Sequence, residues 1–489
     1  MKYKKNSCNN YNILPKINFI KKSIYLIGIG GIGMCGIAKI LIKLGYKVSG
    51  SDIIETYTIK DLILLGAKIY LGHNNTEHIS KTDIVVISTA IKPNNPELLF
   101  AINNNMYIMH RAHMLSELMK YYYNIIVCGT HGKTTTTAMI CEIFQLLKQH
   151  PTFINGGIIK KTKLYANLGN SKYFITEADE SDKSFLYFNP IINVITNIDN
   201  EHLECYANNI ELLKEHFLKL MEKVPFYGCN IICIDNNHIM QLIHNNNIKN
   251  NIITYGFKNN AHYQLTNYIQ KNNTSTFNIT NIQQNMTWLI KLNIPGIHNA
   301  LNATAAFITS QYIGLKNSQI ITALEQYSGT QRRYDIRGYF KYNFNKFHGK
   351  VVIIDDYGHH PTEIKMTIQT IRYSWPKYRL IMIFQPHKYS RIKNLLQEFV
   401  QILSTVDNLF ILDVYSAGEQ YLKDANSYIL YKKIKKLGIV IPVLSKWYNY
   451  YDLITSISTV LKGKDILLFQ GAGDINCLSS LLIKNKFKI

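Results

Sequence analysis

Short apolar runs that end in polar or glycine-rich loops recur along the chain, and most of them are followed by amphipathic segments. The first run, at residues 23–27, passes into a glycine-rich turn and then into a helical pattern of apolar residues at 37–41. Similar runs stand at residues 124–128 and 350–354. Apolar runs of this length are typical of buried strands, and strands that alternate with helices form parallel sheets. The pattern predicts the α/β fold class.

Three such series of strands and helices predict three domains. We place a Rossmann-like domain at residues 1–123, a central α/β domain of the phosphate-loop ATPase type at 124–329 and a second Rossmann-like domain at 330–489. The length of 489 residues supports this division at roughly 150 residues per domain. The pattern weakens in the asparagine-rich stretch 236–285, where we expect variable sheet and surface loops.

The central unit carries the strongest chemical signal. Residues 127–137 read Val-Cys-Gly-Thr-His-Gly-Lys-Thr-Thr-Thr-Thr, between a strand pattern and a helix pattern, with Val127 in place of the first glycine of the full phosphate-loop motif. In such a loop backbone N–H groups and the helix N-terminus bind phosphate, the lysine reaches the β- and γ-phosphates, and the next hydroxyl ligates Mg²⁺. We predict an ATP site formed by Gly129, Thr130, His131, Gly132, Lys133, Thr134 and Thr135.

Polar clusters follow the next two predicted strands of the central unit. Residues 177–182 read Glu-Ala-Asp-Glu-Ser-Asp, and residues 197–202 read Asn-Ile-Asp-Asn-Glu-His. Because ligands bind beyond the carboxyl ends of the strands in an open α/β sheet, we expect both clusters to converge on Lys133. Glu177 and His202 are therefore candidate ligands of a metal ion or of phosphate-bound water.

The N-terminal unit opens with a glycine loop, Gly-Ile-Gly-Gly-Ile-Gly at residues 28–33, between a strand and a helix. Asp52 ends the second strand, where a dinucleotide enzyme would hold a ribose hydroxyl. Taken alone, these features favour an NAD-dependent dehydrogenase. The loop requires only a diphosphate at a helix N-terminus, however, so a UDP-linked compound fits it as well. A dehydrogenase would leave the phosphate loop at 127–137 without a use.

Further polar clusters lie in the last third of the chain. In the helix pattern at 298–306, His298, Asn299 and Asn302 share a face that can meet a base or ribose. Strand patterns then deliver Asp-Asp-Tyr-Gly-His-His-Pro-Thr-Glu at 355–363 and Gln-Pro-His-Lys-Tyr-Ser-Arg at 385–391. No carboxylate at metal-ligand spacing accompanies the two histidines at 359 and 360, so we expect them to orient an anionic ligand.

Taken in order, these motifs resemble those of the Mur ligases from about residue 23 to residue 476. The motifs that carry the resemblance lie at residues 28–34, 129–137, 177–182, 197–202, 298–306, 332–338, 355–363 and 385–391. Asn95-Pro96-Glu97 and residues 111–119 resemble further parts of the N-terminal domain of this family. Lys388 stands where the family often has arginine, and Cys35 where other small residues are common.

The resemblance implies a reaction and its substrates. The N-terminal domain would bind UDP-N-acetylmuramate, the central domain ATP and the C-terminal domain the amino acid. The doubled glycine at 30 and 31 is similar to that of the member that joins L-alanine to the lactyl carboxylate through an acyl phosphate. Its products are UDP-N-acetylmuramoyl-L-alanine, ADP and phosphate, for peptidoglycan precursor synthesis. A recycling ligase that adds a tripeptide to the same UDP sugar is the alternative within the family.

The resemblance also assigns roles to individual residues. It implies UDP-substrate contacts at Gly28, Gly30, Gly31, Gly33, Met34 and Asp52, and Mg²⁺ ligands at Thr134, Glu177 and His202. Further ATP contacts would be Asn299, Asn302, Arg333 and Asp356, and the amino acid would be handled by Tyr357, His359, His387 and Arg391. The implied catalytic residues are Lys133, His202, Arg333, His359 and Arg391.

Charge and cysteine content limit the partners and the compartment. The formal net charge is +22, but the lysines are scattered and the basic stretches at 2–5 and 432–436 are short, so we expect no nucleic-acid partner. A nucleic-acid-dependent ATPase would explain the charge and the phosphate loop, but not the clusters at 357–359 and 387–391. The eight cysteines lack disulfide spacing, and no run reaches about 18 apolar residues. We expect a cytoplasmic monomer or homodimer that does not insert into membranes.

Overall fold

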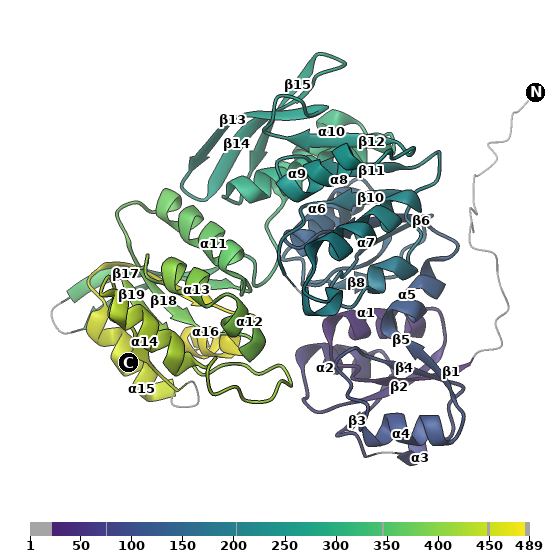
Figure 1. Ribbon diagram of the computed structural model, residues 1–489, viewed down its shortest axis with the longest axis horizontal. Coiled ribbons are helices and arrows are strands. Elements are labelled where there is room, and N and C mark those ends of the chain that lie inside the picture. Colours follow the sequence, from purple (N-terminus) through teal and green to yellow (C-terminus); the bar gives the residue numbers. More distant parts are fainter. Residues whose placement is uncertain (1–21, 75, 202, 345–346, 447–449, 485–489) are drawn as a thin grey trace, which may run out of the picture.

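The computed structural model of the chain describes residues 22–74, 76–201, 203–344, 347–446 and 450–484. Its described strands form three sheets, each covered by helices (Figure 1). The N-terminal sheet lies below the central sheet in this view, and the C-terminal sheet lies to one side of both. The predicted α/β class with three units is confirmed, whereas the boundaries at residues 123/124 and 329/330 stay predictions.

The N-terminal sheet is parallel, with strand order β3-β2-β1-β4-β5. Its central strand β1 is the apolar run found in the sequence, and Ile24 to Ile27 are all buried. The strands are β1 (Ser23–Ile27), β2 (Lys47–Asp52), β3 (Lys68–Leu71), β4 (Ile84–Ile87) and β5 (Tyr107–His110). The helices are α1 (Ile32–Lys43), α2 (Tyr57–Leu64), α3 (Thr76–Ile79), α4 (Pro96–Asn103) and α5 (Arg111–Met119).

The central sheet has the order β15-β14-β13-β12-β11-β10-β6-β9-β7-β8, in which β12 to β7 run parallel. Its strands are β6 (Tyr123–Cys128), β7 (Thr152–Ile154), β8 (Ala166–Asn167), β9 (Tyr173–Glu177), β10 (Ile192–Ile195), β11 (Cys229–Cys233), β12 (Ile252–Gly256), β13 (Tyr263–Lys271), β14 (Thr274–Asn281) and β15 (Met286–Leu292). Its helices are α6 (Lys133–Leu146), η1 (Ser184–Tyr187), η2 (Leu203–Tyr206), α7 (Ile210–Glu222), α8 (Asn237–Asn245), α9 (Ile297–Tyr312) and α10 (Asn317–Gln326). The asparagine-rich stretch forms α8 and β12 to β14.

The C-terminal sheet has the order β16-β17-β21-β18-β19-β20, with β16 antiparallel to β17 and the other pairs parallel. Its strands are β16 (Asp335–Phe344), β17 (Phe347–Asp356), β18 (Arg379–Phe384), β19 (Asn408–Ile411), β20 (Val443–Leu444) and β21 (Lys464–Gln470). Its helices are α11 (Pro361–Ser374), α12 (Tyr389–Asn394), α13 (Leu396–Leu403), α14 (Ser427–Leu437), α15 (Tyr450–Val460) and α16 (Ile475–Lys484).

The domains are joined in two different ways. One apolar core continues from the N-terminal into the central domain, where Ile37 and Leu41 of α1 belong to the same cluster as Ile154 and Ala166. The C-terminal domain has its own cores and meets the central domain through polar contacts. Burial of a continuous apolar surface is the dominant favourable term in association, so the first two domains form one packed body.

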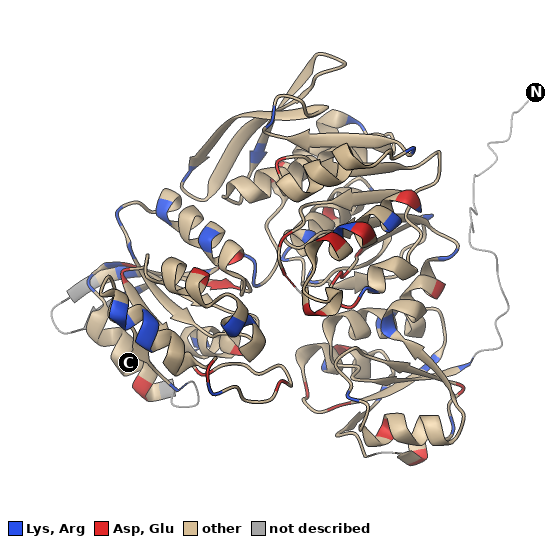
Figure 2. Cartoon of the chain, in the orientation of Figure 1, with Lys and Arg blue, Asp and Glu red and all other residues tan. Residues whose placement is uncertain are grey.

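Two surface properties bear on possible partners. Lys and Arg are distributed over all three domains (Figure 2). Within the described part of the chain, no helix is both long enough and apolar enough to cross a membrane.

The shared core depends on a glycine in α1. A Cβ on Gly36 would lie 2.7 Å from Ile154 Cγ2 and 3.4 Å from Ala166 Cβ. We expect Gly36→Val to lower the free energy of unfolding by about 1–3 kcal/mol, because the added atoms overpack this contact. Urea titration followed by circular dichroism measures the loss. Gly31→Ala is the control, since a Cβ there meets nothing closer than 3.8 Å; equal midpoints for the two variants would contradict the packing described.

Candidate active site

The phosphate loop connects β6 to α6 at the carboxyl edge of the central sheet. Gly129 and Gly132 have φ angles of 119° and 86°, a region in which other residues are strained. A Cβ on Gly132 would also lie 2.6 Å from Asn302 Oδ1. Val127 is fully buried inside β6, so the strand extends through the position where the longer motif has a glycine.

Lys133 is held at the end of this loop. Its Nζ donates hydrogen bonds to the carbonyl oxygens of Gly129 (2.7 Å) and Thr130 (3.2 Å) and to Glu180 Oε2 (2.8 Å). Burial acts to lower the pKa of Lys133, but the carboxylates of Glu180 and Asp179 outweigh it and raise the pKa. The lysine therefore stays charged, and a phosphate can take the place of these partners.

A candidate Mg²⁺ site lies beside Lys133. Thr134 Oγ1 donates a 2.7 Å hydrogen bond to Glu177 Oε2, so the two predicted ligands meet. A Cβ on Gly156 would lie 1.9 Å from Glu177 Oε1 and 3.1 Å from Thr134 Oγ1, which shows that this glycine keeps space open around both oxygens. A hydroxyl and a carboxylate are the hard oxygen donors that Mg²⁺ prefers, so the residues present fit this ion. His202 lies outside the described residues, and its metal and catalytic roles stay predictions.

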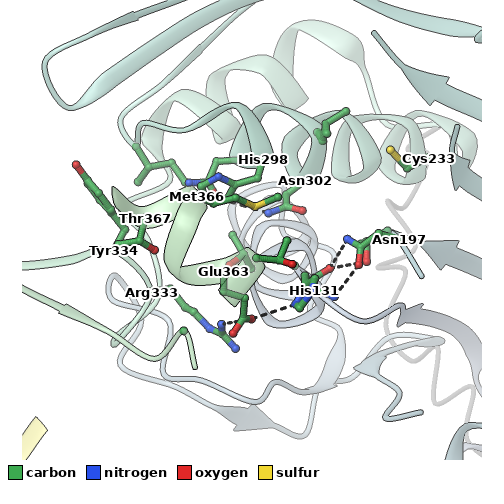
Figure 3. Close-up of a pocket in the computed structure, with 18 of the residues that line it drawn as sticks. His131, Asn197, Cys233, His298, Asn302, Arg333, Tyr334, Glu363, Met366 and Thr367 are labelled. Atoms are coloured by element: carbon green, nitrogen blue, oxygen red, sulfur yellow. Dashed lines mark hydrogen bonds and ion pairs between the residues drawn. The ribbon is translucent and has the colours of Figure 1, made fainter. Parts of the chain in front are cut away.

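A cavity of about 260 Å³ lies beside the phosphate loop, between the central and C-terminal domains. His298 and Asn302 reach it from α9, Glu363, Met366 and Thr367 from α11 (Figure 3). Seven residues of the predicted ATP site line it: His131, Gly132, Thr135, Asn299, Asn302, Arg333 and Asp356. The remaining four, Gly129, Thr130, Lys133 and Thr134, belong to the adjoining loop. The cavity thus has the place expected for a nucleotide whose phosphates reach Lys133.

A charged cluster stands between this cavity and the C-terminal domain. His131 Nε2 lies 3.1 Å from Asp199 Oδ2, and its Nδ1 lies 3.4 Å from Glu363 Oε1. Burial acts to lower the pKa of His131, but the hydrogen bonds with Asp199 and Glu363 raise it to about 10. Arg333 Nη1 lies 3.5 Å from the same Glu363 oxygen. Two cations therefore converge on Glu363 beside the place proposed for phosphate.

The donor atoms of His131, Asp199 and His360 lie within 4.8 Å of one another, as they would around a metal ion. His360 Nδ1, however, accepts a hydrogen bond from the backbone N–H of Thr362 and caps α11. In a neutral imidazole the proton is then on Nε2, which leaves that atom a donor and no metal ligand. The expectation that the histidine pair at 359 and 360 orients an anionic ligand stays a prediction.

The side chain of Asp356 mainly holds nearby backbone segments in place. Its carboxylate accepts hydrogen bonds from the N–H groups of Tyr334 (2.8 Å) and Gly358 (2.9 Å) and from Gln470 Nε2 (2.7 Å). These bonds fix the two segments that carry Arg333 and Tyr357 against each other. Asp356 also lines the cavity, so its predicted ATP contact is compatible with its position.

The four residues predicted to handle the amino acid lie together at the edge of the C-terminal sheet. The rings of Tyr357 and His359 meet edge to face with centroids 5.5 Å apart, and those of His359 and His387 lie 5.4 Å apart. The guanidinium groups of Arg332 and Arg333 both lie 5.0 Å from the centre of the Tyr357 ring. Burial and the nearby charges of His359 and Arg391 lower the pKa of His387 to about 2, so His387 is a neutral acceptor.

Arg391 bridges this edge to the central domain. Its Nη2 donates to Glu201 Oε1 at 3.0 Å and its Nη1 contacts His387 Nδ1 at 3.1 Å. His359 Nε2 lies 3.5 Å from the same Glu201 oxygen. A second cavity, of about 420 Å³, is lined by Arg391 and Glu201. Lys388, whose backbone has a φ of 69°, lines it as well. A substrate carboxylate at Arg391 would therefore compete with Glu201.

The glycine loop of the N-terminal domain lies between β1 and α1. Gly28 has a φ of 79°, and the N–H of Gly30 donates to Asp52 Oδ2 at 2.7 Å. A Cβ on Gly33 would lie 3.0 Å from Arg111 Nη1, whereas Gly31 has open space around it. The loop thus presents backbone groups at a helix N-terminus, as a diphosphate requires. The side chain of Met34 is buried in the core, so a contact with substrate would come from its backbone.

Several functional candidates were not selected from the sequence. Glu180, Glu201 and Glu363 stand inside the motifs at 177–182, 197–202 and 355–363, but only the fold shows that they pair with Lys133, Arg391 and His131. Their signal is a carboxylate in the loop that follows a buried strand or in the first turn of a helix. Arg111 follows β5 and lies next to both Gly33 and Asp182.

Family models match three consecutive parts of the chain. Residues 23–123 match the Mur ligase family catalytic domain, residues 127–310 the Mur ligase middle domain, and residues 344–473 the Mur ligase glutamate ligase domain. The three matches follow the three sheets in order.

Individual proteins agree with this assignment. The chain is 48% identical over 488 residues to UDP-N-acetylmuramate–L-alanine ligase of Buchnera aphidicola subsp. Acyrthosiphon pisum (strain Tuc7), covering 98% of this chain and 99% of that one. It is 46% identical to the ligase of the same name from Wigglesworthia glossinidia brevipalpis, over 93% and 94% of the two chains. The crystal structure of UDP-N-acetylmuramate-alanine ligase MurC from Thermotoga maritima is similar with a TM-score of 0.79 and 26% identity, covering 95% of this chain and 99% of that one. The chain therefore belongs to the Mur ligase family of ATP-dependent, amide-forming ligases.

Proposed function

We propose that this chain joins L-alanine to the lactyl carboxylate of UDP-N-acetylmuramate at the expense of ATP, giving UDP-N-acetylmuramoyl-L-alanine, ADP and phosphate for peptidoglycan synthesis. The observation that supports it most is the convergence of the Lys133, Thr134 and Glu177 cluster with the His359, His387 and Arg391 edge across one domain interface. Relatives with the L-alanine ligase name match nearly the whole chain at up to 48% identity. The 22%-identical murein peptide ligase of Psychrobacter arcticus shares the fold alone.

The order of the domains suggests how the substrates are distributed. In this proposal residues 1–123 bind the UDP sugar, residues 124–329 bind ATP and residues 330–489 bind alanine. The free, mostly buried cysteines fit the reducing cytoplasm, where we place the reaction, in a monomer or homodimer.

A carboxylate is a poor electrophile, so we infer that it is first phosphorylated by ATP. One Mg²⁺ held by Thr134 and Glu177, and a second held by His202, would offset negative charge on the phosphates. The ammonium of Lys133 leaves Glu180 to contact the transferring phosphoryl group, where preorganised positive charge stabilises the transition state. His131 and Arg333 stand next to the same place and add positive charge.

The second step is attack of the alanine amine on the acyl phosphate, with loss of phosphate from a tetrahedral intermediate. Arg391 is suited to grip the alanine carboxylate, because its planar guanidinium matches two carboxylate oxygens. Neutral His387 and the neighbouring ring of His359 line the approach to the acyl centre.

Replacement of Lys133 tests the phosphoryl-transfer role. We expect Lys133→Ala to reduce ATP-dependent phosphate release by about a thousandfold or more, since a preorganised charge at the transferring group is lost. Circular dichroism should show an intact fold. The exposed Lys249→Ala is the matched control and should keep full activity; substantial turnover by Lys133→Ala would refute the assignment.

The metal site is tested through the Mg²⁺ dependence of phosphate release. Glu177→Gln should raise the Mg²⁺ concentration for half-maximal activity by about tenfold or more, because a neutral amide is a weaker ligand. Gly156→Ala should act in the same direction by displacing the Glu177 carboxylate. The exposed Glu211→Gln serves as control. An unchanged Mg²⁺ requirement in both site variants would place the metal elsewhere.

The alanine site is tested by a change that keeps the charge. Arg391→Lys should raise the KM for L-alanine by about tenfold, with much smaller effects on the KM values for ATP and the UDP sugar, because the two-pronged grip is lost. Steady-state kinetics with each substrate varied in turn gives the comparison. Lys393→Ala, an exposed neighbour, is the control. An effect confined to the UDP sugar would assign Arg391 to that substrate instead.

A further inference from the structure

The N-terminal domain contains a buried carboxylate that the proposed reaction does not use. Glu97, from the Asn95-Pro96-Glu97 motif, stands in the first turn of α4 and is fully buried. Its Oε1 accepts a 3.0 Å hydrogen bond from Tyr25 Oη, and its Oε2 accepts one from Ser51 Oγ. His73 Nδ1 lies 3.4 Å from the same Oε2. A buried carboxylate lowers the stability of the fold unless hydrogen-bond donors surround it. We therefore expect Glu97 and its donors to have a functional role.

The hydrogen bonds decide which ring nitrogen of His73 carries the proton. Ser51 has one hydroxyl proton and gives it to Glu97, so its oxygen is an acceptor toward His73 Nδ1 at 3.0 Å. Both groups that face Nδ1, the Ser51 oxygen and the Glu97 carboxylate, are therefore acceptors. In the neutral imidazole Nδ1 is protonated and Nε2 is left as an acceptor. The side chain of His73 is 17% exposed, so the ring reaches the surface of the domain.

His73 also has the right place for nucleotide recognition. Ser51 and Asp52 end β2, and His73 follows the neighbouring parallel strand β3 by two residues. In a Rossmann-type unit the end of the second strand is where a ribose hydroxyl is bound. Here Asp52 uses Oδ2 to accept from the N–H of Gly30 and Oδ1 to accept from the N–H of Ile53. Asp52 thus holds the glycine loop, and His73 Nε2 is an additional acceptor at the same edge.

We propose that His73 recognises the ribose of the UDP moiety, with Nε2 accepting a hydrogen bond from a ribose hydroxyl, and that Glu97 is the positioning residue that fixes the required tautomer through Ser51. This inference rests on the proposed function, because it needs a uridine nucleotide in the N-terminal domain. This role explains the buried carboxylate. Glu97 accepts hydrogen bonds from both Ser51 Oγ and His73 Nδ1, and this keeps the proton of the neutral ring on Nδ1 and leaves Nε2 without one.

Calorimetric binding of UDP, 2′-deoxy-UDP and 3′-deoxy-UDP tests the proposal. The wild-type protein should bind at least one deoxy analogue about tenfold more weakly than UDP, as expected for one lost hydrogen bond. His73→Ala should bind UDP about tenfold more weakly and no longer distinguish that analogue. Glu97→Gln, which keeps the ring but frees the tautomer, should also lose most of the distinction.

Tyr25→Phe is the matched control, because it removes a donor to Glu97 but leaves the Ser51 oxygen and the Glu97 carboxylate that face His73 Nδ1, and it should keep the wild-type ratio. In turnover, His73→Ala and Glu97→Gln should raise the KM for the UDP sugar and leave kcat nearly unchanged, which a general loss of structure would not do. If Glu97→Gln fails to fold, the result for His73→Ala decides.

Two results would overturn the inference while leaving the proposed function in place: wild-type protein that binds UDP and both deoxy analogues equally, or a His73→Ala variant that keeps the wild-type ratio. Failure of the wild-type protein to bind UDP at all would remove the proposed function and the inference together.

Discussion

The active-site geometry depends on a buried pair of opposite charges, Arg391 of the C-terminal domain and Glu201 of the central domain, with their atoms 3.0 Å apart. Both side chains are less than a tenth exposed, so each would be strongly destabilised without the other. His359 and His131 approach the same carboxylate, and Thr362 binds Asp199 nearby. These contacts place the edge of the C-terminal sheet that carries His359 and Arg391 against the phosphate loop of the central sheet.

The two domain junctions differ in their physical character. Between the N-terminal and central domains the contact is apolar and continuous, and separation would expose α1 and its partners to water. Between the central and C-terminal domains the contact is charged and hydrogen-bonded, and only a ligand that supplies an equivalent charge can replace the buried Arg391–Glu201 pair without a large cost. The N-terminal domain is therefore tied to the central domain by apolar packing, whereas the C-terminal domain is held by polar interactions.

Local patterns in the sequence were sufficient for most of the fold. The apolar runs at 23–27, 124–128 and 350–354 lie in strands, and the spacing of glycine and lysine predicted the phosphate loop, because these features depend on neighbouring residues. Several strands were not predicted, among them β3, β7, β8, β11, β16, β19 and β20. Five of these, all but β11 and β16, are only two to four residues long. The packing of α1 against Ile154 and Ala166 has no such local signal in the sequence, because it joins segments that are far apart along the chain.

The site was predictable in its residue types but not in its pairings. Thr134 and Glu177 were expected to meet because both follow strands of one sheet, and they do. Glu201 and Arg391 are 190 positions apart in different domains, and only their three-dimensional arrangement reveals the pair. Asp52 was predicted to contact the UDP substrate, and this stays a prediction; its oxygens also accept hydrogen bonds from the backbone of Gly30 and Ile53, which composition and spacing do not show.

The central claim is that one site couples ATP to amide formation between a UDP-linked carboxylate and alanine. It is tested most directly by phosphate release from ATP in the presence of UDP-N-acetylmuramate, screened against single amino acids and a muramyl-type tripeptide, with the product identified by mass. We expect release that requires the UDP sugar and is greatest with L-alanine, with a product heavier by one alanyl residue. Release that favours the tripeptide, or that proceeds without any amine, would contradict it.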